Sequence, residues 1–328
     1  MPRLKRVRLL TPRVSLICTL ALISVLLGLQ PTRAAEVGAN DFQISAMGTA
    51  DAAGELSNFS SAVAFNSTAN EYLAVWSGDD ITPAGTGDFE IFGQRLNATT
   101  GTKIGAQFPI SSMGSGANQG ARDATNPAVA YNSFNNEWLV VWEGDNTTDG
   151  ELDIYSKRIK IGAGGVTEPQ AQVRISDMGD TTGAYDAVEP DVACNPTNGT
   201  CLIVWSGTDN ASGLVNTEFE IYRTLLPASG TPASTKAYAR LSDMGPDGSG
   251  AYNAKTPAVS YNGTSTQYLV VWSGNEFVSS LPDPEYEIYG QLVTAAGAAT
   301  GTNDFRISDV GLVGETVSNR ASADAETP

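Results

Sequence analysis

Four tryptophans divide this chain into units of nearly equal length. Trp76, Trp142, Trp205 and Trp272 are separated by 66, 63 and 67 residues. Each tryptophan lies near the end of a segment of the same type; the four segments are "SAVAFNSTANEYLAVWSGDD", "PAVAYNSFNNEWLVVWEGDN", "PDVACNPTNGTCLIVWSGTD" and "PAVSYNGTSTQYLVVWSGNE". A period of this size restricts the fold to an array of similar supersecondary units.

Two further landmarks recur in each unit. The second reads "FEIFGQRL", "LDIYSKRI", "FEIYRTLL" and "YEIYGQLV". The third occurs five times, in the form "VRISDMG", around Ile44, Ile110, Ile175, Leu241 and Ile307. Four complete units are therefore preceded by one copy of the third landmark and followed by an unfinished fifth unit.

Each landmark has the pattern of a β-strand. Runs such as "AVAYN" and "YLVVW" are β-branched and aromatic, and the polar stretch between them predicts a hairpin. Four short strands in about 65 residues predict an all-β, propeller-like array of four complete four-stranded blades and a partial fifth. A β-sandwich needs more strands than one unit holds, and solenoid coils are usually shorter. We place the units at about 41–107, 108–172, 173–238 and 239–304, with the partial unit at 305–328.

The first 35 residues predict a secretory signal. A basic start that includes Arg3, Lys5 and Arg6 precedes an apolar run of roughly 16 residues, shorter than the about 20 that a membrane span needs. We therefore expect residues 36–328 to form the repeat domain of a protein that is secreted or held at the cell surface, with no stable membrane insertion once the signal is removed. Removal leaves 13 Lys and Arg against 36 Asp and Glu, a balance that disfavours nucleic acid as a partner.

The chain contains no histidine. This excludes a Ser-His-Asp triad, a Cys-His pair and any metal site that depends on imidazole.

The combination P-x-V-A-Y-N, Y-L-V-V-W-S-G-D and I-[FY]-G-Q-R resembles tandem propeller-type repeats of large exported bacterial proteins, from Asp41 to about Ser308. Such repeats are often joined to adhesive modules. The resemblance implies a non-catalytic scaffold for binding or adhesion, with a glycan or a surface protein as partner. It leaves open a ring of four blades, a ring of five, and a fragment of a larger assembly.

Acidic residues are concentrated between the second and third strands of each unit. In a propeller these loops emerge on one face, and their oxygens are the ligands that Ca²⁺ prefers. The alternative is a solvated acidic rim. The candidate calcium ligands are Asp79, Asp80, Asp88, Glu90, Asp145, Asp149, Asp153, Asp209, Glu220, Asp283 and Glu287.

Four of these acids, Glu90, Asp153, Glu220 and Glu287, recur at the start of the third strand, and we interpret them first as acceptors for backbone or indole N–H groups. Tyr185 and Tyr252 follow the third landmark of two units. They are candidates for stacking on a sugar, with packing between blades as the alternative.

The competing functional hypothesis is a lectin or a glycoside hydrolase that uses the acidic rim, because pairs of carboxylates support glycoside hydrolysis. We do not favour an enzyme, since active sites on repeat proteins usually break the symmetry of the repeat.

Unit three alone carries two cysteines. Cys194 and Cys201 occupy the positions of the aromatic pairs Phe65/Tyr72, Tyr131/Trp138 and Tyr261/Tyr268. Residues opposite each other across a hairpin are close enough for a disulfide. We predict a Cys194–Cys201 disulfide that fixes the register of this hairpin and agrees with export.

Overall fold

The computed structural model describes residues 42–45, 58–79, 89–113, 122–145, 150–162, 165–167, 170–179, 184–210, 213–232, 234–235, 237–275 and 286–309. All of these belong to one unit of the chain, Phe42–Pro328. The predicted signal and most of the partial fifth unit lie outside the described residues. Within them, no helix is long and apolar enough to cross a membrane.

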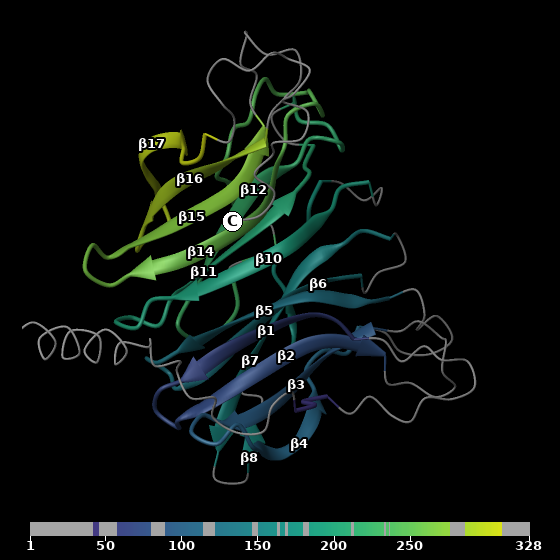
Figure 1. Ribbon diagram of the computed structural model, residues 1–328. Coiled ribbons are helices and arrows are strands. Elements are labelled where there is room, and N and C mark those ends of the chain that lie inside the picture. Colours follow the sequence, from purple (N-terminus) through teal and green to yellow (C-terminus); the bar gives the residue numbers. More distant parts are fainter. Residues whose placement is uncertain are drawn as a thin grey trace, which may run out of the picture. The chain divides into compact units, whose positions relative to one another are not determined.

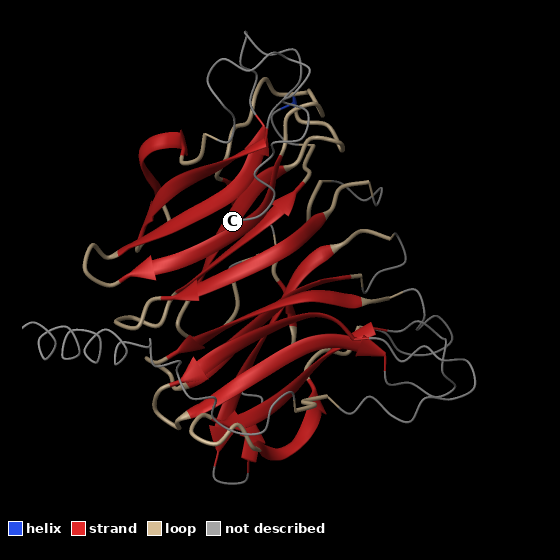
Figure 2. Cartoon of the chain, viewed as in Figure 1, coloured by secondary structure: helices blue, strands red, loops and turns tan. Residues whose placement is uncertain are grey.

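The described residues form seventeen strands in four antiparallel sheets, which confirms the predicted all-β, propeller-like array (Figures 1 and 2). Sheet 1 contains β1 (Asn58–Asn66), β2 (Glu71–Asp79), β3 (Phe89–Asn97) and β4 (Lys103–Pro109). Sheet 2 contains β5 (Ala124–Asn132), β6 (Glu137–Gly144), β7 (Asp153–Gly162), β8 (Gly165–Thr167) and β9 (Val173–Arg174). Sheet 3 contains β10 (Ala187–Cys194), β11 (Cys201–Gly207), β12 (Glu220–Leu226) and β13 (Ala239–Arg240). Sheet 4 contains β14 (Ala254–Asn262), β15 (Gln267–Asn275), β16 (Tyr286–Thr294) and β17 (Ala299–Arg306).

The fourth strand of each unit is its least regular element. In sheet 2 it is split, and β8 and β9 both pair with β7. In sheet 3 it is reduced to two residues. This irregularity agrees with the short, half-polar sequence of the third landmark. A strand at the edge of a sheet pairs with one neighbour instead of two, so it forms fewer backbone hydrogen bonds.

An asparagine closes each hairpin between the first and second strands. The side-chain oxygen of Asn66 accepts hydrogen bonds from the backbone N–H groups of Thr68 and Ala69, both at 2.9 Å. Asn195 accepts one from Thr197 at the same distance. This local capping explains why an asparagine, in the dipeptides "FN", "YN" and "CN", marks the turn in every unit.

Each sheet has two apolar faces, which we name after residues of its second strand. The leucine face carries a Leu-x-Val pair, and the tryptophan face carries the repeated tryptophan. The leucine face of sheet 1, with Leu73 and Val75, packs on the tryptophan face of sheet 2, with Trp138, Val140 and Trp142. Sheets 2 and 3, and sheets 3 and 4, pack in the same way. These interfaces form the core, and they bring β1, β5, β10 and β14 side by side as the innermost strands.

Candidate functional site

The recurring acid at the start of each third strand anchors the third landmark. The carboxylate of Glu90 accepts the hydroxyl of Ser111 and, at 2.6 Å, the backbone N–H of Met113. Glu220 does the same with Ser242 and Met244. Asp153 and Glu287 accept the corresponding serines, Ser176 and Ser308. In the described structure these four carboxylates therefore hold the last strand of each unit in place.

The remaining candidate calcium ligands do not converge in the part of the chain that can be described. Asp80, Asp88, Asp149, Asp283 and the side chain of Asp79 lie outside it. Asp145 and Asp209 are buried, and Asp209 accepts the hydroxyl of Tyr238 at 3.0 Å. No three acidic or cysteine side chains among the described residues are arranged to hold a metal ion. Calcium binding by the acidic loops stays a prediction.

The two candidate sugar-stacking tyrosines pack against the core. Tyr185 lies against the cluster between sheets 2 and 3, and Tyr252 against that between sheets 3 and 4. Their rings cover Gly179 and Gly245, where an added Cβ would come within 2.3 and 2.5 Å of ring carbons. Both glycines have positive φ. The geometry therefore favours the packing alternative for these tyrosines.

The predicted disulfide joins Cys194 to Cys201, which are directly opposed in the β10–β11 register. The equivalent aromatic pair Tyr261/Tyr268 has its ring centroids 4.8 Å apart. The disulfide thus takes the place of a cross-strand aromatic contact, and it links only the two strands of its own hairpin.

A cavity of about 340 Å³ opens where the four innermost strands begin. Each of these strands has a bulge there, and the bulged residue has a left-handed backbone: φ is 38° at Ser60, 48° at Asn126, 56° at Glu189 and 50° at Thr256. The four residues line the cavity, together with Pro127, Pro190, Pro257 and Ala258. Bulges and left-handed non-glycine residues often occur at functional sites, where they direct a side chain. We call this opening the axial cavity.

Three carboxylates at or near the axial cavity break the repeat. Glu189 takes the place held elsewhere by Ser60, Asn126 and Thr256. Glu143, on β6, takes the place of Ser77, Ser206 and Ser273. Asp191, on β10, takes the place of Ala62, Ala128 and Ala258. The other units have small neutral residues at these three positions, so a charge there is not required to form a blade.

Glu143 connects sheet 2 to the bulge of sheet 3. Its Oε1 accepts the Thr125 hydroxyl at 2.9 Å and the Asn126 amide at 2.8 Å, and its Oε2 accepts the backbone N–H of Glu189 at 2.8 Å. At the next interface, the hydroxyl of Ser206 accepts the backbone N–H of Thr256 at 3.0 Å. A serine therefore suffices for this contact, and Glu143 adds a charge.

Glu189 is held at the cavity by one of its two oxygens. Its Oε2 accepts the Ser206 hydroxyl and the Thr256 backbone N–H, both at 2.9 Å. No described residue donates a hydrogen bond to its Oε1. The side chain is thus fixed in position and still has an acceptor available for a ligand in the cavity.

Burial raises the pKa of two of these carboxyl groups. Glu143 is 6% exposed; desolvation raises its pKa, its three hydrogen bonds oppose the change, and the charge of Glu189 adds to it. Desolvation also raises the pKa of Asp191, against the backbone N–H groups of Val259 and Val192. Among the described residues no Lys or Arg forms an ion pair with any of the three carboxylates. Carboxyl groups whose pKa is raised by burial beside a cavity are candidates for an acid–base site.

None of these three residues was among the candidates predicted from the sequence. Charge is densest in the loops, whereas these carboxylates lie on strands with few charged residues. The signal was present as two departures from the repeat, "WEG" in place of "WSG" in unit two and "EPD" in unit three. The axial cavity therefore shows the break in symmetry whose absence we took as an argument against an enzyme.

No protein-family model and no curated protein sequence matches the chain. Several solved structures share the arrangement of its sheets. The microbial sialidase Hz136 has a TM-score of 0.46 at 8% identity, over 75% of this chain and 46% of the sialidase. The α-L-arabinofuranosidase Arb93A from Fusarium graminearum, solved with an iminosugar inhibitor, has a TM-score of 0.46 at 10% identity, over 74% and 72% of the two chains. A thermostable family-43 glycoside hydrolase has a TM-score of 0.43 at 11% identity, over 76% of each chain.

At these identities and TM-scores the likeness transfers neither an activity nor a residue role to this chain. The match spans less than half the length of the sialidase. Two predictions from the sequence, that the chain is a non-catalytic scaffold and that it is not an enzyme, are contradicted by this comparison, since the matched structures include glycoside hydrolases. Near-identical blades are compatible with an active site when a few residues on the innermost strands differ.

Proposed function

We propose that the protein is a glycoside hydrolase that binds a carbohydrate at the axial cavity and cleaves a glycosidic bond with Glu189 and Asp191. The observation that carries the proposal is the set of three carboxylates at and beside this cavity, at positions where the other blades have small neutral residues. A buried carboxylate that lacks a cation destabilises a fold. Glu143 is buried and Glu189 and Asp191 are half-buried, and none of them has an ion pair among the described residues, so chemistry explains this set better than packing does.

Glycoside hydrolysis suits this set of side chains. The reaction uses one carboxylic acid to protonate the leaving oxygen and one carboxylate to assist attack at the anomeric carbon, and it needs neither histidine nor thiol. Asp191 directly follows the cavity-lining Pro190 on β10, and burial raises its pKa; in this proposal it is the proton donor. Glu189, with an unoccupied acceptor at the cavity, acts on the anomeric side. The C–O bond breaks, water supplies the hydroxyl of the new hemiacetal, and its proton restores the acid.

Glu143 has a different role in this scheme. Both of its oxygens already accept hydrogen bonds from Thr125, Asn126 and Glu189. It positions the backbone of Glu189 and the amide of Asn126.

The protein acts outside the cytoplasm in this proposal. The basic and apolar residues 1–35 support export, and so does the Cys194–Cys201 disulfide, because disulfides persist mainly in oxidising compartments. The expected partner is a glycan.

A panel of chromogenic glycosides tests the proposal. The wild-type chain and the double variant Glu189→Gln/Asp191→Asn are assayed for release of the aglycone, and calorimetry measures binding of the matching oligosaccharide. The control, Asp243→Asn, removes one carboxylate from an exposed site. We expect turnover by the wild type and the control, and oligosaccharide binding without turnover by the double variant. Binding of glycans with no turnover by the wild type would make the cavity a lectin site, and undiminished turnover by the double variant would exclude the two carboxylates.

A further inference from the structure

The two end sheets of the array expose the apolar faces that the inner sheets bury. In sheets 1 to 3 the Leu-x-Val pair of the leucine face is fully buried under the next sheet. In sheet 4 the same pair is Leu269 and Val271, and Leu269 is 37% exposed. Ile307 follows β17 and is 51% exposed, although its equivalents Ile110 and Ile175 are buried. The leucine face of sheet 4 thus has no covering sheet among the described residues.

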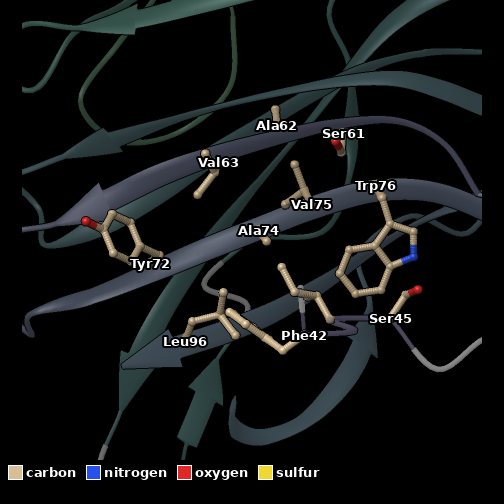
Figure 3. Close-up of a pocket in the computed structure, with 11 residues that line it drawn as sticks. Phe42, Ser45, Ser61, Ala62, Val63, Tyr72, Ala74, Val75, Trp76 and Leu96 are labelled. Carbon is tan, nitrogen blue, oxygen red and sulfur yellow. The ribbon is translucent and has the colours of Figure 1, made fainter. Parts of the chain in front are cut away.

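The tryptophan face of sheet 1 is open in the same way. A groove of about 630 Å³ runs along it, lined mainly by apolar side chains that include Val63, Tyr72 and Leu96 (Figure 3). Tyr72 is 38% exposed and Val63 62% exposed. In sheet 2 the corresponding Trp138 is fully buried by the leucine face of sheet 1.

One part of this groove is already filled. Ile44, from the segment Phe42–Ser45, packs on Trp76 and Phe92, as Ile110 packs on Trp142 and Tyr155 one sheet later. The part that remains open is the hairpin end, around Val63 and Tyr72. At every internal interface the hairpin end is covered by the Leu-x-Val pair of a neighbouring sheet.

We propose that the open hairpin end of sheet 1 binds the leucine face of sheet 4 from a second copy of this chain. Each internal interface joins one leucine face to one tryptophan face, and the same side chains recur on the two end sheets. A second copy therefore offers a surface of matching chemistry without any new element. Among the described residues, the strands of sheets 1 and 4 make no extensive contact with each other.

The resulting interface is heterologous, because different surfaces of the two copies meet. Such contacts generate rings or open chains of subunits. Exposed apolar faces of this kind mark association sites when they are contiguous. The axial carboxylates lie on other strands, and the inference is independent of the proposed function.

A complementation experiment tests the proposal. Val63→Asp places a charge in the groove of sheet 1, and Leu269→Asp places one on the leucine face of sheet 4; both side chains are exposed enough to change without unfolding the chain. Light scattering and sedimentation velocity report the mass over a wide range of concentrations. We expect the wild type to associate, each variant alone to be monomeric, and an equimolar mixture to form dimers and nothing larger, because each copy retains one intact face.

The control is Thr264→Asp, which adds the same charge at an exposed turn between β14 and β15 and should associate like the wild type. Circular dichroism confirms that all variants are folded. A wild-type monomer at every concentration would overturn the proposal. So would an assembly that neither substitution weakens, or a mixture of variants that stays monomeric.

Discussion

Replacing Glu189 with asparagine separates catalysis from folding at the axial cavity. Asparagine already occupies the equivalent position at Asn126, with φ 48° against 56° at Glu189. It is among the residues that adopt the left-handed conformation most readily. We therefore expect the bulge of β10 to persist in Glu189→Asn.

The structure predicts a small change in stability for this variant. The substitution removes the carboxylate that accepts hydrogen bonds from the Ser206 hydroxyl and the Thr256 N–H, each of which contributes about 1 kcal/mol to stability in net terms. The Thr256 N–H keeps the Ser206 hydroxyl at 3.0 Å, so no backbone donor is left unsatisfied. The loss is offset by relief of left-handed strain, of about 1 kcal/mol, and by removal of a charge beside Glu143. The free energy of unfolding should stay within about 1 kcal/mol of the wild type, which corresponds to a Tm change of about 2–4 °C.

The effect on catalysis should be far larger. A carboxylate that assists the chemical step contributes about 10²–10⁴-fold to the rate, or about 3–5 kcal/mol of activation free energy. We expect kcat/KM to fall by this factor on a glycoside that the wild type cleaves, while calorimetry shows an almost unchanged Tm. Retention of kcat/KM would refute the assigned role. A fall in activity that is matched by a large fall in Tm would refute the claim that the bulge tolerates asparagine.

Three other predictions concern stability. Replacing Cys194 and Cys201 together with serine should lower the free energy of unfolding by about 2–3 kcal/mol through lost loop closure; coincident urea transitions of variant and wild type would contradict this. Burial raises the pKa of Glu220 from 4.5 to about 7, so the folded state retains a proton that the unfolded state releases, and stability should fall as pH rises through this interval. The Glu220→Gln variant should lose that dependence, and a parallel pH profile would count against it. Glu137 and Arg158 form an ion pair in which each side chain is 4% exposed. Glu137→Leu should lower the free energy of unfolding by about 3–5 kcal/mol, because the charge of Arg158 stays buried without a partner. The double variant Glu137→Leu/Arg158→Leu should recover much of this stability, which a double-mutant cycle measures.

The fold could be predicted from the sequence because the residues that determine it are close in sequence and recur in every unit. The polar turn after Asn66 and its equivalents joins two apolar strands in every unit, so hairpins could be predicted from short segments. The disulfide followed from the same register, since Cys194 and Cys201 align with aromatic pairs of other units. The recurring acids such as Glu90 were correctly placed at the start of the third strand, but their partners, the serine and the methionine N–H of the third landmark, come from more than twenty residues away.

The candidate site could not be predicted from local sequence in this way. Glu143 lies on β6, whereas Glu189 and Asp191 lie on β10 of the next sheet. Their separation in sequence gives no indication that they are close. The acidic loops attracted attention because charge is densest there, and the resemblance to adhesive repeats favoured a scaffold. Both arguments relied on composition, whereas the three carboxylates stand out only by comparison of equivalent positions between blades.

The sequence by itself determined the number of units, the strands within each unit and their pairing, because hydrogen bonding within a hairpin and the alternation of side chains across a strand depend on neighbouring residues. It also fixed which positions are charged in only one blade. The tertiary structure decided which strand of each unit is innermost and which faces meet. That choice arises from packing between sheets, where each leucine face is buried by a tryptophan face. It brings the bulges of β1, β5, β10 and β14 together around one cavity and places the carboxylates of two blades beside it.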